Sequence, residues 1–322
     1  MKPANILVLG GSGFLGSYLV PRLDEAGHTI TVPTRHYERA RHLMVLPKTI
    51  ITKWEPEDDA SLDRLFAGKD VVINLVGILH GRSAVATDPY GPDFRRYHVE
   101  FMDRLLRMAE RHLVSRIIHV SALGVTDADP ATLPSSYLRS KAAAEQALRN
   151  SSIDWVVFRP SVMFGPGDSL LTGFARMLRW MPFLVVPCLG ARFQPVYVRD
   201  VADAMTQAVH DARTTRRVFE MGGPEVMTLE EMVRLAGKHS GHRRPVFGVP
   251  LSIGHLMAMV MEKLPGRTVM SRDNLMSMKI DSVASAPIDP IFGLTPSSID
   301  AVAPSYLGPI DSPFNEERRA NR

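Results

Sequence analysis

The chain opens with a short apolar run that ends in a glycine-rich turn. Residues 5–9 (NILVL) form the run, and residues 10–16 (GGSGFLG) follow at once, before a helical pattern. Glycines at this spacing allow a sharp turn, let backbone N–H groups approach a pyrophosphate, and let the next helix pack closely on the strand. The turn therefore predicts a dinucleotide site. Its expected binding residues are Gly10, Gly13, Phe14, Leu15 and Gly16.

The end of the second predicted strand indicates which dinucleotide is bound. An Asp or Glu about 20 residues after the glycine turn would hold the ribose 2′-hydroxyl of NAD. Here the strand over 28–32 runs into Thr34 and Arg35 instead, without an acid. A guanidinium can grip a 2′-phosphate with two parallel charge-assisted hydrogen bonds. Arg35 therefore favours NADP(H) over NAD(H).

Short apolar strands alternate with helical patterns through the first half of the chain. The strands are predicted over 6–9, 28–32, 49–52, 71–75, 116–120 and 155–158, and the clearest helices over 14–26, 94–112 and 137–149. Strands that are apolar on both faces are typical of a parallel sheet covered by helices on each side. The predicted fold class is α/β, a doubly wound, Rossmann-like parallel sheet with a smaller C-terminal cap lobe.

The alternation fails after residue 160, where Pro- and Gly-rich segments separate shorter elements. We expect a dinucleotide-binding domain over 1–160, rejoined by 193–215 through a strand at 196–198 and a helix at 201–210. Segments 161–192 and 216–310 are expected to form the cap lobe over the strand ends, where ligands bind in open α/β sheets. The polar stretch 311–322 is expected to be a flexible tail.

A phenol and an ammonium stand four residues apart in Tyr137-Leu138-Arg139-Ser140-Lys141, on one face of the predicted helix. Lys141 could stabilise tyrosinate, so that Tyr137 exchanges a proton with a carbonyl or hydroxyl as hydride moves. Ser121, after the fifth strand, is the candidate third catalytic residue, although Ala122 could occupy that position instead. Asn74 and Gly77, after the fourth strand, are expected to approach the cofactor.

Composition restricts the class of protein. The 322 residues carry a formal net charge of +4 and one cysteine, Cys188, which fits a reducing, cytoplasmic compartment and excludes an internal disulfide framework. No zinc-ligand spacing and no interleaving of aromatic with basic residues is seen, so neither a metal site nor nucleic-acid binding is expected. The longest apolar stretch, 180–189, contains two prolines and is too short to span a membrane.

Two further features have alternative interpretations. Three arginines lie three or four residues apart on one predicted helix face: Arg104, Arg107 and Arg111. This face is either exposed to solvent or a contact for an anionic partner or membrane surface. The segment 251–264 carries three methionines in an apolar helical pattern. Core packing is the favoured interpretation of this segment, and a lipid- or quinone-facing surface is the alternative.

At these residues the chain resembles the short-chain dehydrogenase/reductase superfamily, in the extended and atypical branches that include nucleotide-sugar epimerases. The glycine turn, the Tyr137/Lys141 pair, the segment 159–168 (RPSVMFGPGD) and the segment 195–202 (PVYVRDVA) carry the resemblance. It implies that Pro160 and Val162 lie in the loop beneath the nicotinamide. Residues 74–77, 121–124 and 137–141 are similar to bacterial relatives of the nucleotide-binding accessory subunit of respiratory complex I.

Two functions follow from these observations. The first is an NADP(H)-binding protein of the complex I accessory type, with a structural, assembly or redox-sensing role and a possible location at the periphery of the inner membrane, as the resemblance implies. The second is an active NADP-dependent reductase or epimerase that acts on a small carbonyl or sugar-nucleotide substrate through Tyr137 and Lys141. The sequence indicates neither the substrate nor the oligomeric state.

Overall fold

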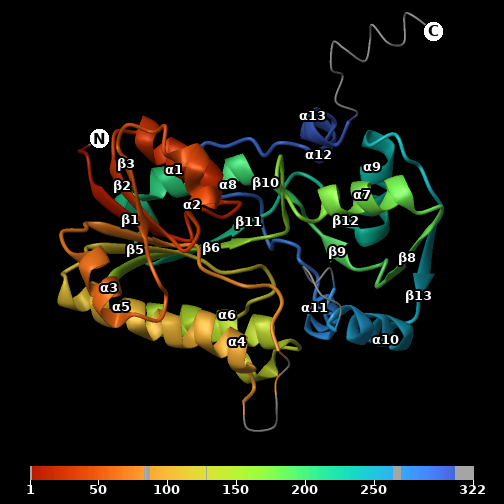
Figure 1. Cartoon of the computed structure of the whole chain (residues 1–322), viewed down its shortest axis with the longest axis horizontal. Helices are drawn as coiled ribbons and strands as arrows, with labels where there is room; N and C mark the ends of the chain where they lie inside the picture. Colours follow the sequence, from red (N-terminus) through yellow and green to blue (C-terminus); the bar gives the residue numbers. More distant parts are fainter. Residues whose placement is uncertain (1, 83, 85–87, 128, 264–269, 309–322) are drawn as a thin grey trace, which may run out of the picture.

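A seven-stranded parallel sheet forms the centre of the computed structural model, which describes residues 2–82, 84, 88–127, 129–263 and 270–308 (Figure 1). Its order is β11-β6-β5-β4-β1-β2-β3, and every neighbouring pair is parallel. The strands are β1 (Asn5–Leu9), β2 (Thr29–Thr34), β3 (Thr49–Lys53), β4 (Val71–Asn74), β5 (Arg116–Val120), β6 (Asp154–Pro160) and β11 (Arg217–Met221). The predicted Rossmann-like sheet is confirmed.

Helices cover both faces of this sheet because its central strands are apolar on both sides (Figure 1). One face packs against α1 (Gly16–Glu25) and α8 (Val198–Ala208), and the other against α3 (Asp59–Phe66), α5 (Phe101–Arg111) and α6 (Ser136–Arg149). The short α2 (Tyr37–Ala40) follows β2. The helix predicted over 94–112 is composite, with α4 (Pro92–Phe94), a π-helical stretch (Arg95–Glu100) and then α5.

The cap lobe has an apolar core of its own, beside the sheet (Figure 1). Its helices are α7 (Leu171–Trp180), α9 (Leu229–His239), α10 (Leu251–Met261), α11 (Arg272–Ser277), α12 (Ile299–Val302) and α13 (Pro304–Leu307). Its strands pair as β8 (Leu184–Pro187) with β13 (Val246–Val249) and β9 (Arg192–Phe193) with β12 (Met227–Thr228). The predicted tail, 311–322, lies outside the described residues.

Two strands lie elsewhere than expected. The strand predicted at 196–198 to rejoin the main sheet is β10 (Val196–Tyr197), which pairs instead with β7 (Met163–Phe164) in a separate two-stranded sheet. The seventh strand of the main sheet is β11, within the segment expected to belong wholly to the cap lobe. The expected helix did return, as α8. A local pattern can indicate a strand, but the partner of that strand depends on distant residues. For β11 the partner is β6.

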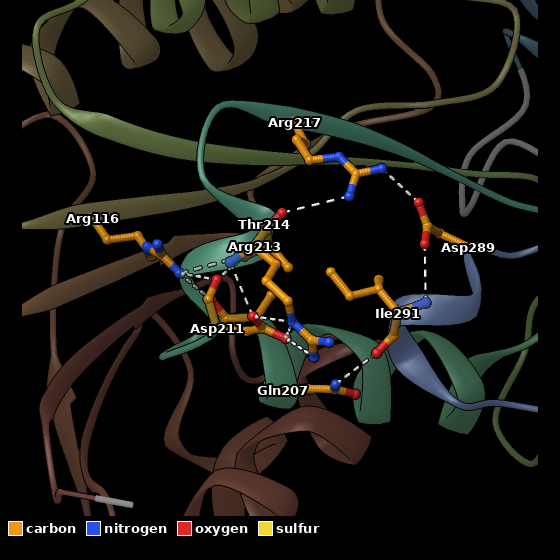
Figure 2. A network of polar contacts seen from close by, with 9 residues as sticks. Arg116, Gln207, Asp211, Arg213, Thr214, Arg217, Asp289 and Ile291 are labelled. Atoms are coloured by element: carbon orange, nitrogen blue, oxygen red, sulfur yellow. Dashed lines mark hydrogen bonds and ion pairs between the residues drawn. The ribbon is translucent and has the colours of Figure 1, made fainter.

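A polar network holds β11 and a returning C-terminal segment against the main sheet (Figure 2). Arg217 of β11 forms an ion pair with Asp289 at 2.6 Å, and Asp289 also accepts a hydrogen bond from the N–H of Ile291. Gln207 of α8 donates to the Ile291 carbonyl at 2.9 Å. The segment around 289–292 therefore belongs with the main sheet in space, although it was expected in the cap lobe.

The methionine-bearing helix does not lie in a core, so the favoured core-packing interpretation of 251–264 is wrong. Within α10 only Gly254 and Ala258 are buried, whereas Leu256 is 61% exposed and Val260 is 54% exposed. Periodicity indicated the helix correctly, but it could not indicate that nothing in the described part of the chain covers the outer side. No helix in that part combines the length and apolar character needed to span a bilayer.

The arginines of α5 have partners within the protein. Arg104 Nε donates to Asp59 at 2.6 Å, and Arg111 lies 3.2 Å from Asp63, both acids belonging to α3. Arg107 is exposed between them. Two of the three cations therefore join α5 to α3, and the predicted arginine face is chiefly a contact between two helices.

Candidate dinucleotide site

The glycine turn after β1 leaves no room for side chains at two of its positions. Gly10 has a φ of +80°, and a Cβ there would lie 3.0 Å from the carbonyl carbon of Leu75. A Cβ on Gly16 would lie 2.2 Å from the carbonyl oxygen of Gly11, so α1 begins in direct contact with the turn. Gly13 closes the turn by donating its N–H to the Gly10 carbonyl at 3.0 Å. These contacts form the cradle that a pyrophosphate requires.

No side chain caps the start of α1. Leu15, the residue before the helix, is buried and apolar, and the N–H of Ser17 donates to the Gly13 carbonyl at 2.9 Å, so the positive end of the helix dipole lies against the turn. Phe14 is partly buried and packs edge-on against Tyr18. The Tyr18 hydroxyl donates to the Pro166 carbonyl at 2.8 Å, which brings the loop after β6 across this helix end.

The loop after β6 contains the two residues that the resemblance placed beneath the nicotinamide. Pro160 ends β6 and its carbonyl accepts a hydrogen bond from the N–H of Leu123 at 3.0 Å. Val162 follows, half-buried, and its carbonyl accepts from the N–H of Val196. Both residues therefore lie at the carboxyl end of the sheet, beside the strand end that carries Ser121.

The end of β2 lies beside the glycine turn. Thr34 is buried and its hydroxyl is 3.2 Å from the Ser12 hydroxyl, so the two segments are joined at the side chain. Arg35 comes next and is exposed. This is the position at which the adenosine half of a dinucleotide passes the second strand in this fold.

Tyr137 and Lys141 lie on one face of α6, as their spacing predicts. The Lys141 ammonium donates to the Val120 carbonyl at 3.1 Å, and burial lowers the pKa of Lys141 to about 8. Burial also raises the pKa of Tyr137 to about 12. The expected lowering of the tyrosine pKa by Lys141 is therefore not produced by the protein's own groups, because desolvation of the phenol alone shifts its pKa, and shifts it upward.

A buried histidine, which sequence reasoning did not identify, packs against this pair. His98 Nε2 accepts the N–H of Ile78 at 3.0 Å, so its Nδ1 carries the proton and donates to Ser140 Oγ at 2.7 Å. The ring centroid of His98 is 5.9 Å from that of Tyr137. Burial and the Lys141 charge lower the pKa of His98 well below its usual value. The π-helical stretch that carries His98 has no local sequence signal.

Two polar atoms at the end of β5 are buried without a partner in the described part of the chain. They are Ser121 Oγ and His119 Nε2. His119 Nδ1 is 3.3 Å from the amide nitrogen of Asn74, and the amide oxygen of Asn74 accepts the N–H of Val76. A Cβ on Gly77 would lie 3.0 Å from the Lys141 ammonium. The structure thus brings Asn74, Gly77 and Lys141 together.

The first turn of α6 is closed by a residue from the cap lobe. Asp273 of α11 accepts the N–H of Ser136 at 2.7 Å and the N–H of Tyr137 at 3.0 Å. Ser135 caps the same helix by accepting the N–H of Leu138. Asp273 lies 136 residues from Tyr137 in the chain, so no local pattern could have paired them.

Comparison with known families agrees with this geometry. Residues 6–222, about two thirds of the chain, match the model of the NAD dependent epimerase/dehydratase family. The chain belongs to this family. The matched region includes the glycine turn, the Tyr137/Lys141 pair and the loop after β6.

Curated relatives of this epimerase/dehydratase family member carry respiratory names. It is 34% identical to "NADH dehydrogenase [ubiquinone] 1 alpha subcomplex subunit 9, mitochondrial" of Arabidopsis thaliana over 71% of the chain and 56% of that protein. It is 30% identical to the "NADH-ubiquinone oxidoreductase 40 kDa subunit, mitochondrial" of Neurospora crassa over 83% of the chain and 68% of that protein. The chain thus spans little more than half the length of the Arabidopsis relative.

A solved structure shares the fold of this family member. An NADPH-dependent quinone oxidoreductase from Escherichia coli, complexed with NADPH, superposes with a TM-score of 0.70 at 17% identity. The match covers 94% of the chain and 99% of that structure. The likeness shows that the cap lobe as well as the sheet follows a known fold.

Proposed function

We propose that the chain binds NADP(H) between the glycine turn and Lys141, and that the bound coenzyme serves a structural, assembly or redox-sensing role beside a respiratory NADH dehydrogenase. The glycine cradle supports coenzyme binding, because a Cβ on Gly16 would overlap the Gly11 carbonyl. The names of the mitochondrial relatives support the respiratory role. A bound nicotinamide would supply hydride exchange, and Lys141 would hold its ribose through the ammonium.

The preference for the phosphorylated coenzyme rests on Arg35. The guanidinium follows β2 without an intervening acid, and Thr34, joined to Ser12, anchors the backbone just before it. Loss of a charge-assisted pair to a 2′-phosphate weakens binding about tenfold or more. We expect Arg35→Ala to weaken NADPH binding by that factor and to leave NADH binding unchanged. Arg39→Ala, an exposed arginine four residues on, is the matched control.

A role other than rapid turnover is favoured by the state of the acid–base residues. A phenol with a pKa of about 12 is a poor base at neutral pH, and the residues after Ser121 are apolar. The protein's own groups are therefore better suited to binding a nucleotide than to ionising Tyr137.

The test is to purify the chain under native conditions, release its nucleotide, identify it and count it per chain. Titration calorimetry with NADPH and NADH then gives both affinities. We expect close to one nucleotide per chain, with NADPH the tighter ligand. Chain that carries no nucleotide and binds neither form would overturn the coenzyme proposal, whereas equal affinities would overturn the NADP(H) preference alone.

The respiratory role has a separate test. Membranes of the source organism are solubilised and fractionated on a density gradient, and the chain is located by antibody beside NADH:quinone oxidoreductase activity. We expect comigration for the wild-type chain. Migration only at the size of the free chain would refute the association while leaving coenzyme binding untouched.

A second candidate is an active NADP-dependent reductase or epimerase. It is favoured by the retention of Tyr137 and Lys141 on one helix face and by the Ser121 hydroxyl, which is buried at the end of β5 without a partner in the described part of the chain. Reduction of a panel of small carbonyl compounds and sugar nucleotides by NADPH tests this candidate. Turnover that disappears in Tyr137→Phe, with NADPH affinity retained, would establish it in place of the first proposal.

A further inference from the structure

The outer end of the cap lobe presents a large apolar surface to solvent, which we name the outer face. Trp180 is 78% exposed and Phe247 is 55% exposed, and both are side chains that ordinarily avoid water. Contiguous exposed apolar patches of this kind mark interaction sites. The residues of the outer face are Trp180, Met181 and Phe183 from the α7–β8 turn, Phe247 from β13, and Ile253, Leu256, Met259 and Val260 from α10.

These residues come from elements that pack on one another. The rings of Phe183 and Phe247 lie 5.9 Å apart, at the start of the paired strands β8 and β13. The chain passes directly from β13 into α10, which packs on β8 so closely that a Cβ on Gly254 would lie 2.6 Å from the Pro187 ring. In Figure 1, β8, β13 and α10 together form the end of the molecule farthest from the N-terminus. The elements that carry the outer face are therefore neighbours at one end of the molecule.

The two segments that carry most of the outer face contain basic but no acidic residues. The segments 169–199 and 232–261 contain no Asp or Glu, although they form α7, β8, β13, α10 and most of α9. They carry exposed Arg176, Arg179, Arg243 and Arg244. No hydrogen bond or ion pair to a carboxylate is seen for these four guanidinium groups in the described part of the chain. Uncompensated positive charge beside apolar side chains complements a negatively charged, amphipathic partner.

A hollow of about 430 Å³ opens along α9, with Leu178, Arg243 and Arg244 among its lining residues. Its acidic lining residue Glu231 accepts hydrogen bonds from Thr228. Two other lining cations have partners, since Arg234 pairs with Glu230 at 2.6 Å and Lys238 pairs with Asp300 at 3.0 Å. Arg243 and Arg244 remain for an outside anion. Because Phe247 lies three residues after Arg244, phosphate contacts and apolar contacts can be made by the same partner.

We propose that the outer face docks on the surface of an anionic phospholipid bilayer. Its apolar side chains enter the boundary between headgroups and acyl chains, and Arg243 and Arg244 contact lipid phosphates. Stable binding at a membrane surface takes two signals, and this face supplies both an apolar helix of about 16 Å and a basic cluster. The outer face and the nucleotide cleft are separate, so either can be right without the other.

Flotation of the purified chain with vesicles tests the proposal. We expect the chain to float with vesicles of phosphatidylcholine and phosphatidylglycerol at 0.1 M salt, and not with phosphatidylcholine alone. Charge near an anionic surface changes affinity about fivefold per arginine. Arg243→Gln/Arg244→Gln should therefore weaken binding about 25-fold, and Leu256→Ser/Val260→Ser should abolish it. These side chains are exposed, so the melting temperature should not fall.

Controls on the opposite lobe make the result specific. Arg107→Gln and Leu113→Ser change an exposed arginine and an exposed leucine at α5, and both should bind like the wild-type chain. Equal flotation with neutral vesicles, no flotation at all, or loss of binding in the α5 variants would each overturn the proposal. A change from dimer to monomer on sedimentation of Leu256→Ser/Val260→Ser would also overturn it, because a second copy would then be the occupant.

Discussion

Lowering the pH from 7.5 to 5.5 should destabilise the folded chain by about 3 kcal/mol through two buried imidazoles. Burial lowers the pKa of His98 and of His119 well below 6.5, so the folded state keeps both rings neutral. The unfolded chain binds a proton at each ring below pH 6.5, and one pH unit below that value each ring contributes about 1.4 kcal/mol in favour of unfolding. The contribution of the two neutral rings to the free energy of unfolding is therefore fully present above pH 6.5 and is lost as the pH falls below that value.

Other groups act on this figure in both directions. Burial raises the pKa of Asp200, so protonation of that carboxyl favours the folded state as the pH falls. Carboxylates with ordinary pKa values near 4 remain ionised in both states through most of the window. Burial also lowers the pKa of His28, which adds to the loss in the same direction.

The assay is urea unfolding at both pH values, followed by circular dichroism. Replacement of one ring, His119→Gln, should reduce the pH-dependent loss by about 1.4 kcal/mol, whatever its effect on stability at pH 7.5. His36→Gln, at an exposed position after β2, should leave the loss unchanged. An equal free energy of unfolding at the two pH values, or an undiminished loss in His119→Gln, would refute the reasoning.

Three substitutions carry further predictions. Lys141→Met should raise the free energy of unfolding at pH 7 by about 2 kcal/mol and weaken NADPH binding. The shift of the Lys141 pKa from 10.5 to about 8 reflects about 3 kcal/mol of desolvation, from which the lost hydrogen bond to Val120 is subtracted. Urea unfolding and calorimetry measure the two effects, and unchanged stability would contradict the prediction. Arg116→Met should lose about 3 kcal/mol on urea unfolding, since its guanidinium bonds Asp154 at 2.7 Å and joins the network of Figure 2. Gly16→Ala should lower the melting temperature and abolish NADPH binding, whereas Gly173→Ala, with open space around its Cβ, should not lower the melting temperature.

The sheet could be predicted because its central strands are short, buried on both faces and separated by helices with clear periodicity. β1 and β4, for example, differ from their predicted bounds by one residue each. The turn at Gly10 and the spacing of Tyr137 and Lys141 are equally local, and the structure places them as expected. Such features depend on residues within one or two turns of one another.

The remaining features depend on contacts between distant segments. β11 joins the sheet through β6, 61 positions earlier in its register, and its own alternating pattern does not reveal that partner. Burial of α10 was expected from its composition, yet the sequence pattern of an apolar helix is the same whether protein, lipid or water covers it. The raised pKa of Tyr137 is likewise a property of its surroundings, which only the folded chain supplies.

The carboxylate of Asp273 acts as a latch between the two lobes. It is the point at which α11, packed against α10, holds the first turn of α6 through two amide groups. Moving α11 away from α6 would leave both N–H groups without an acceptor and would remove about 3 kcal/mol of charge-assisted hydrogen bonding. It would also remove a negative charge from beside Tyr137. A displacement of α10 would thereby reach the first turn of the helix that carries Tyr137, with one acidic side chain as the link.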